Sequence, residues 1–135
     1  MNEIRISAIR LTPLFLTFKE PYHWAGRVDH GSPVVLVEIE TDAGVTGVGE
    51  SVSSLAAEMT MAAFRAVEPL LIGQPIHDVA RLVHEARHLG TFNHLPWFAG
   101  FMLAGFEMAL WDAIGKAAGQ PVYRLLGGAV RDEVD

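Results

Sequence analysis

The chain has 135 residues, half of them hydrophobic and 19% charged, which excludes a disordered polymer and suits one domain with a buried core. Its formal net charge of −6 offers no basic surface for nucleic acid or anionic lipid. There is no cysteine, so disulfides, thiolate zinc sites and cysteine nucleophiles are excluded.

The N-terminal segment and the most apolar stretch predict a cytoplasmic protein. The first ten residues, MNEIRISAIR, are charged and lack the apolar core of a signal peptide. Residues 95–110 are nearly continuously apolar, but they are too few for a comfortable membrane span and are soon followed by Asp112 and Lys116. A buried helix is predicted there. Its only charge, Glu107, is expected to be a buried hydrogen-bond link between elements.

The first half of the chain predicts a three-stranded antiparallel meander. Ile4 and Ile6 alternate with polar neighbours, and the phase slips near Ala8, which indicates a strand with an irregularity. Residues 33–41 are β-branched with period two and should place Val35, Val37 and Ile39 on one face. A short loop with Gly44 at positive φ then leads to a return strand at residues 45–50.

Residues 17–32, between the first two strands, show no sustained period and are predicted to form a long loop. Loops of this length inside a compact domain are usually functional or disordered. The aromatic and basic side chains of this segment favour a functional loop. They are Tyr22, His23, Trp24, Arg27 and His30.

The second half of the chain predicts helices. Ser53 or Ser54 is expected to cap a first helix that ends near Pro69. Its expected apolar side includes Leu55, Met59 and Ala63. Asp78 is expected to cap a second helix, whose apolar positions are Val79, Leu82, Val83 and Ala86.

A third helix, residues 97–118, is rich in alanine and glycine, so a neighbouring element could pack very close to it. A short final helix is expected between Pro121 and Gly127. Strands followed by helices indicate the α+β class.

Residues 84–88 fit the zinc-hydrolase pattern H-E-x-x-H, with His84, Glu85 and His88 in register and His94 at the place of a third ligand. Helical geometry, however, turns both imidazoles away from the apolar stripe, toward solvent. Arg81 shares their face and would oppose a divalent cation. We interpret the motif as a coincidence on a solvated face, with a zinc hydrolase as one alternative.

Three ordered segments carry a family resemblance. They are GVTGVGES at 44–51, EPLLIGQP at 68–75 and GFEMALWDAIGKAAGQPVYRLLGGAVRDEV at 105–134. Together they resemble the N-terminal capping domain of the enolase superfamily, in its mandelate racemase/muconate lactonizing enzyme branch. The resemblance implies a capping domain over residues 1–125. Residues 126–135 would begin the link to a (β/α)7β barrel that is absent from this chain.

The resemblance also implies a chemistry. In that family the barrel holds Mg²⁺ through three acidic ligands, and a lysine or histidine of the barrel removes the proton α to a substrate carboxylate. The metal stabilises the resulting enediolate. The present chain is expected to contain neither catalytic residues nor metal ligands, and to be inactive alone. Racemase, dehydratase and cycloisomerase activities all stay open, since the choice depends on the barrel.

Two loops of the capping domain close over the substrate in this family, and closure would expel water. They correspond here to residues 17–32 and to the residues just after Glu50. Arg27 would pair with an anionic group and Trp24 would pack on an apolar part of the substrate. The expected substrate-binding residues are Tyr22, His23, Trp24, Arg27, Ser51 and Ser53.

The expected partners are a small carboxylate substrate, the barrel domain of the same polypeptide and further copies in a homo-oligomer, with no nucleic acid and no membrane. A non-catalytic module that serves self-association or binding is a further alternative, because the long apolar helix could self-associate.

Overall fold

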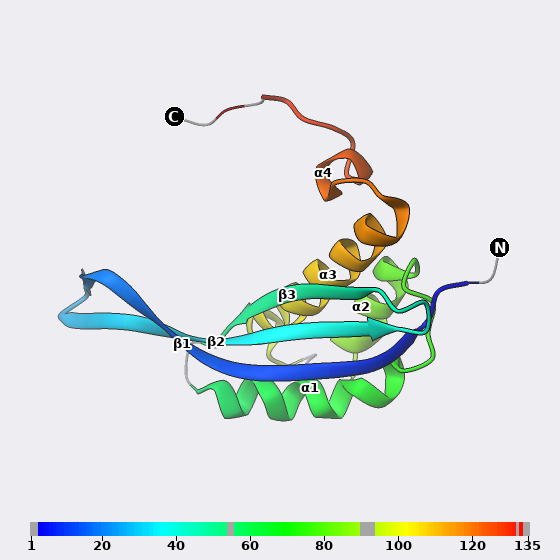
Figure 1. The fold of residues 1–135 in the computed structure, drawn as a ribbon. Coiled ribbons are helices and arrows are strands. Elements are labelled where there is room, and N and C mark those ends of the chain that lie inside the picture. Colours follow the sequence, from blue (N-terminus) through cyan, green and yellow to red (C-terminus); the bar gives the residue numbers. More distant parts are fainter. Residues whose placement is uncertain (1–2, 54–55, 90–93, 132, 134–135) are drawn as a thin grey trace.

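The computed structural model describes residues 3–53, 56–89, 94–131 and 133. Within these residues a three-stranded sheet is followed by four α-helices, which confirms the predicted α+β class (Figure 1). The elements are β1 (Ile6–Trp24), β2 (Arg27–Thr41), β3 (Thr46–Val52), α1 (Ala57–Leu71), α2 (Val79–Arg87), α3 (Pro96–Ala118) and α4 (Val122–Leu125). The described residues form no barrel.

The sheet is the predicted antiparallel meander, in the order β1-β2-β3. The pairing of β1 with β2 shifts register between Ile6 and Ala8, which confirms the predicted strand irregularity. The loop after β2 is closed by Thr41, whose hydroxyl donates to the Val45 carbonyl at 2.8 Å and accepts from the Val45 amide at 3.1 Å. Gly44 has the predicted positive φ, 74°.

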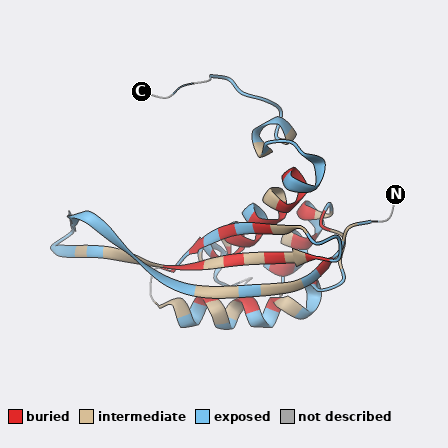
Figure 2. Cartoon of the chain, in the orientation of Figure 1, coloured by how far each residue is buried: buried red, intermediate tan, exposed pale blue. Residues whose placement is uncertain are grey.

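The core lies between one face of the sheet and the helices, as Figure 2 shows by the concentration of buried residues there. Val35, Val37 and Ile39 are fully buried, as predicted from their alternation. Val37 and Ile39 belong to the same core cluster as Phe64 of α1 and Phe106 of α3. Burial of side chains of this size contributes about 1.5–3 kcal/mol each.

Helix α1 differs from its prediction by a small rotation. It begins at Ala57 instead of Ser53 or Ser54, and it ends at Leu71 with Pro69 inside. Its buried residues are Thr60, Phe64, Val67 and Leu71, whereas Met59 is 48% exposed. Of the expected apolar side, Ala63 packs against the core while Met59 faces solvent, so the buried stripe is rotated relative to the predicted one. Ser54 and Leu55 lie outside the described residues.

Helices α2 and α3 follow their predictions. α2 begins after Asp78 and buries Val79, Leu82 and Ala86. α3 is long and apolar enough to span a membrane by length and composition, but 56% of its most apolar window is buried. It packs on β3, β2 and α2, as the core helix of a globular domain does.

Glu107 is exposed on α3, so its predicted role as a buried link is wrong. The side of α3 that carries it also exposes large apolar side chains, so an apolar surrounding in the sequence did not mean burial in the fold. The exposed large apolar residues of this helix are Trp97, Phe101 and Met108.

Helix α3 crosses β3 so closely that the two backbones are in direct contact. A Cβ atom on Gly47 would lie 2.0 Å from the Ala109 carbonyl oxygen, and one on Gly49 would lie 2.0 Å from the Gly105 carbonyl oxygen. On Gly105, it would lie 2.2 Å from the Ser51 hydroxyl. The predicted close approach to the alanine- and glycine-rich helix is therefore confirmed, and β3 is the element that makes it.

The outer edge of β3 is occupied by side chains of the same helix. The Val48 amide donates to Asp112 Oδ2 at 2.8 Å, and Lys116 Nζ donates to the Thr46 carbonyl at 2.8 Å. Asp112 and Lys116 also form an ion pair at 2.6 Å. Backbone groups that would otherwise face water are thus satisfied from α3.

The turn after α1 is held by the start of β1. The Gly73 amide donates to the Ile6 carbonyl at 2.8 Å, and Ile6 in turn donates to the Gln74 carbonyl at 3.0 Å. Arg5 adds a hydrogen bond from Nη1 to the Gly73 carbonyl at 2.8 Å. The LIGQP segment therefore has a structural role, since it fixes the end of α1 against the sheet.

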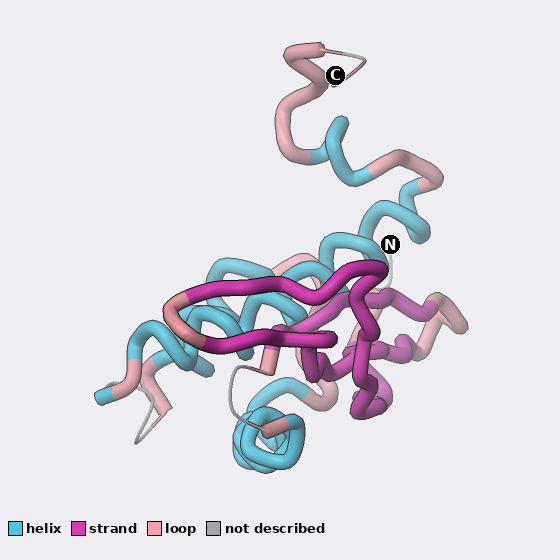
Figure 3. The backbone as a smooth tube through the Cα atoms, turned by 90° about the vertical axis from the view of Figure 1, so that its left-hand side faces the viewer, coloured by secondary structure: helices cyan, strands magenta, loops and turns pink. Residues whose placement is uncertain are grey.

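The predicted loop at residues 17–32 is instead a two-stranded extension of β1 and β2. Beyond the Val34–Val52 pair, only these two strands continue, and we call residues 15–33 the hairpin arm. It projects past the helices in Figure 1 and toward the viewer in Figure 3, where α1 is seen end-on. Both faces of the arm are largely exposed, so its strands need no alternation of apolar and polar residues.

Candidate functional site at the hairpin tip

The end of the arm gathers four of the six predicted substrate-binding residues. Ala25 and Gly26 form a two-residue turn with φ values of 44° and 77°, and positive φ at both positions is typical of tight β-hairpins. The pairs Trp24–Arg27, His23–Val28 and Tyr22–Asp29 flank it. We call residues 22–29 the hairpin tip.

Strand geometry sorts these side chains onto two faces. Alternate residues of a strand share a face, so Tyr22 and Trp24 lie on the same side as their partners Asp29 and Arg27. His23 points to the other side. Tyr22 is 62% exposed and Trp24 is 50% exposed, so this face presents two aromatic side chains and a guanidinium to solvent.

Asp29 connects two of these groups. Trp24 Nε1 donates to Asp29 Oδ2 at 2.6 Å, and Arg27 Nε donates to Asp29 Oδ1 at 2.7 Å. The guanidinium carbon of Arg27 lies 5.9 Å from the centre of the Trp24 ring, within cation–π range. The hydrogen bonds from Trp24 and then Arg27 hold the pKa of the Asp29 carboxyl below its ordinary value.

Sequence reasoning missed Asp29. Its relation to Trp24 and Arg27 is visible only when the segment is known to be a tight hairpin, because the cross-strand pairing and the period of two place the three residues on one face.

The tip also bounds a hollow of about 440 Å³, lined by His23, Trp24, Ala25, Gly26, Arg27 and Val28. The hollow lies on a projecting hairpin, so a bound molecule would be enclosed only if a second surface met the tip.

Ser51 and Ser53 are not part of this group. Ser51 is fully buried and its hydroxyl donates to the Met102 carbonyl at 2.7 Å. Ser53 is 2% exposed and its hydroxyl accepts from Thr60 at 3.2 Å. Both hydroxyls are used inside the domain, so a substrate contact through either serine stays a prediction without support from this geometry.

The H-E-x-x-H segment lies on the solvent side of α2, as predicted. His84 and His88 are exposed, with ring centroids 4.2 Å apart, and His88 Nδ1 lies 2.7 Å from the His84 carbonyl oxygen. Glu85 is paired with Arg81 at 3.1 Å. Hydrogen bonds to Asp78 and then Glu85 raise the pKa of Arg81, so a cation stays beside the histidines. Among the described residues, no three histidine, aspartate or glutamate side chains are grouped to hold a metal.

Comparison with known proteins decides the family. The family model described as mandelate racemase/muconate lactonizing enzyme, N-terminal domain, matches residues 6–127. The chain belongs to this family. The predicted resemblance is therefore confirmed. The close α3–β3 crossing gives the segments at 44–51 and 105–134 a structural role, and the anchored LIGQP turn gives one to the segment at 68–75.

Known members of the mandelate racemase/muconate lactonizing enzyme family include enzymes with stated reactions. D-galactonate dehydratase of Verminephrobacter eiseniae is 38% identical over 121 residues. A mandelate racemase/muconate lactonizing enzyme from Roseovarius nubinhibens has a crystal structure that is 35% identical, with a TM-score of 0.82 over 96% of this chain. The L-talarate dehydratase of Polaromonas sp. JS666, crystallised with Mg and L-glucarate, is 27% identical with a TM-score of 0.81 over 97% of this chain.

The chain spans about a third of the length of these relatives. It covers 28% of the V. eiseniae dehydratase, and 36% and 37% of the two crystallised proteins.

Proposed function

We propose that this chain is the capping domain of a Mg²⁺-dependent isomerase or lyase that removes the proton α to a substrate carboxylate by way of an enediolate. The family and its dehydratase members support this proposal. The observation that carries it is the hairpin tip, which projects from the body and turns aromatic side chains and a guanidinium to one face. In this proposal Mg²⁺ would be held by the barrel domain of the full-length enzyme.

In this proposal the tip contributes enclosure and binding. A carboxylate oxygen pair matches the two outward nitrogens of a guanidinium, so Arg27 would bind the anionic group of a sugar acid. The faces of Trp24 and Tyr22 would cover the less polar side of the molecule and exclude water. Proton transfer would be performed by side chains outside these 135 residues.

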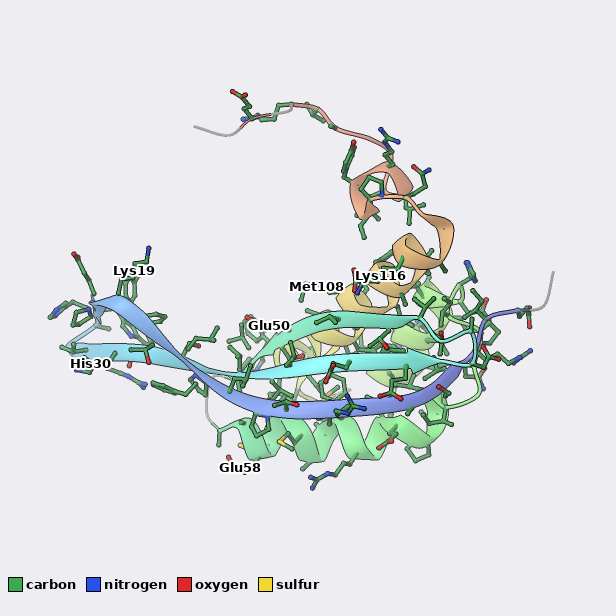
Figure 4. The ribbon with its side chains drawn as sticks, in the orientation of Figure 1. Lys19, His30, Glu50, Glu58, Met108 and Lys116 are labelled. Atoms are coloured by element: carbon green, nitrogen blue, oxygen red, sulfur yellow. The ribbon has the colours of Figure 1, made fainter. Side chains whose placement is uncertain are left out.

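The exposed apolar side chains of α3 support the proposal that another part of the enzyme covers this helix. Trp97, Phe101 and Met108 are each about half exposed, and the rings of Trp97 and Phe101 meet edge to face with centroids 6.1 Å apart. Figure 4 shows Met108 and Lys116 on the upper side of the domain, toward which α4 and the C-terminal segment also extend. We propose that the remaining two-thirds of the enzyme, including its barrel domain, covers this side.

The test compares the full-length enzyme with variants of the tip, with D-galactonate and L-glucarate as substrates and Mg²⁺ present. Loss of a charge-assisted hydrogen bond costs roughly 1.5–3 kcal/mol, so Arg27→Ala should raise KM about tenfold or more. Lys19→Gln removes the same charge from an exposed site on the same arm and should leave KM unchanged. Equal effects of the two variants would contradict a binding role for the tip. The isolated 135-residue chain should show no turnover, and turnover by it would overturn the proposal.

Self-association is a second candidate function, favoured by the same apolar stripe. Size-exclusion chromatography of the isolated chain separates the two. Two results together would favour self-association. The isolated chain would form a dimer that Phe101→Ser dissociates, and the α3 stripe would stay exposed in the full-length enzyme.

A further inference from the structure

The arrangement at the hairpin tip depends on one carboxylate. Asp29 accepts from Trp24 with one oxygen and from Arg27 with the other, so both side chains are fixed to one residue at 2.6 and 2.7 Å. Trp24 and Arg27 face each other across the turn, and Asp29 stands two residues beyond Arg27 on the same face. The carboxylate therefore spans the turn from β2 to β1.

The way in which Arg27 is held leaves its binding edge open. Its contact with Asp29 uses Nε, while 65% of the arginine side chain is exposed. The Nη nitrogens can still pair with an incoming carboxylate. The Asp29 side chain is 21% exposed, so the carboxylate is partly sheltered while its arginine partner stays open to solvent.

We propose that Asp29 is a positioning residue of the hairpin tip, which holds the Trp24 indole and the Arg27 guanidinium in the one arrangement that receives the substrate. Without Asp29, both long side chains would sample several rotamers and binding would have to order them. The inference rests on the proposed function of the tip. It adds that the substrate is met by a preorganised pair of side chains and not by two independent ones.

The first measurement reads the arrangement itself and needs no substrate. In ¹⁵N-labelled full chain, the indole N–H signal of Trp24 is assigned by its loss in Trp24→Phe. Asp29→Ala should shift this signal upfield and speed its exchange with water, because the charged acceptor is gone. Glu20→Gln, which neutralises an exposed carboxylate on the same arm, is the matched control and should leave the signal in place. An unchanged Trp24 signal in Asp29→Ala would overturn the proposal.

The second measurement tests positioning in the full-length enzyme. Asp29→Ala should raise KM for the sugar acid about tenfold and change kcat less, and Asp29→Glu should restore part of the loss. When Trp24 and Arg27 are already alanine, the further change Asp29→Ala should have no effect on KM, because a positioning residue acts through its partners. An equal KM increase in both backgrounds would overturn the proposal. If the wild-type enzyme turned over neither D-galactonate nor L-glucarate, the sugar-acid part of the proposed function would fail, while the indole signal would still decide the role of Asp29.

Discussion

Two regions of the same sheet are held in different ways. One is β3, where α3 crosses it, and the other is the hairpin arm formed by β1 and β2. At the crossing, Gly47 and Gly49 bring strand backbone against helix backbone, with no room for even a methyl group. On the arm, two strands continue with both faces largely exposed, and side-chain hydrogen bonds order the tip. A change at the crossing should therefore act on stability, whereas a change on the arm should act on local order and binding.

The largest effect is expected at the crossing. Gly49→Ala would place a methyl group 2.0 Å from the Gly105 carbonyl oxygen, and neither backbone can move without its neighbours. We expect the free energy of unfolding to fall by about 3 kcal/mol, measured by urea denaturation followed by circular dichroism.

Gly100→Ala is the matched control for this change. Gly100 lies in α3, the helix that packs on Gly49, but a Cβ atom there meets nothing within 4 Å. Replacing an interior helical glycine by alanine should stabilise the domain by about 0.5–1 kcal/mol. If both substitutions changed the free energy of unfolding in the same direction, close backbone packing would not be what holds α3 on β3.

A smaller effect is expected from Ser51, next to the crossing. Ser51→Ala removes the hydrogen bond to the Met102 carbonyl and should cost about 1 kcal/mol of unfolding free energy. Because the hydroxyl is buried, KM of the full-length enzyme should not change. A raised KM with unaltered stability would restore the substrate contact that the sequence predicted.

The smallest effect on global stability is expected on the arm, from protonation of Asp29. The folded-state pKa of this carboxyl is lowered by Trp24 and Arg27, with His30 adding to the effect when charged. Its contribution is thus complete above the ordinary aspartate pKa and is lost as the pH falls through the lowered value.

An NMR titration of the carboxyl carbon and of the Trp24 indole signal checks this prediction. The two signals should change with the same pH midpoint, below that of an exposed aspartate, while the signals of core residues stay unchanged. A midpoint at or above the ordinary aspartate range would mean that the tip is not ordered by this carboxylate.

The sequence predicted those elements whose side chains alternate between core and solvent. The strand at residues 33–41, the slip near Ala8 and the buried face of α2 were all predicted correctly, because one face of each element packs on the core. The hairpin arm was predicted as a loop, since a two-sided exposed hairpin leaves no periodic pattern. Glu107 was predicted to be buried because composition does not reveal which side of an apolar helix stays uncovered.

The candidate site was only partly predictable for the same reason. Aromatic content pointed to residues 22–27, and the structure brings Tyr22, Trp24 and Arg27 onto one face. Asp29 needed the register of the hairpin, and the burial of Ser51 needed the position of α3. Whether the tip residues contact substrate stays a prediction.

The side chains that occupy the outer edge of β3 have a consequence for solubility. An open strand edge invites another chain to add itself as a further strand, which is a common route to fibrils. Asp112 and Lys116 engage the Val48 amide and the Thr46 carbonyl, so an incoming strand would first have to displace an ion pair. On the opposite edge, Pro13 and Pro21 lie within β1 and carry no amide donor for an added strand. Both edge strands of the sheet thus carry features that disfavour the addition of another strand.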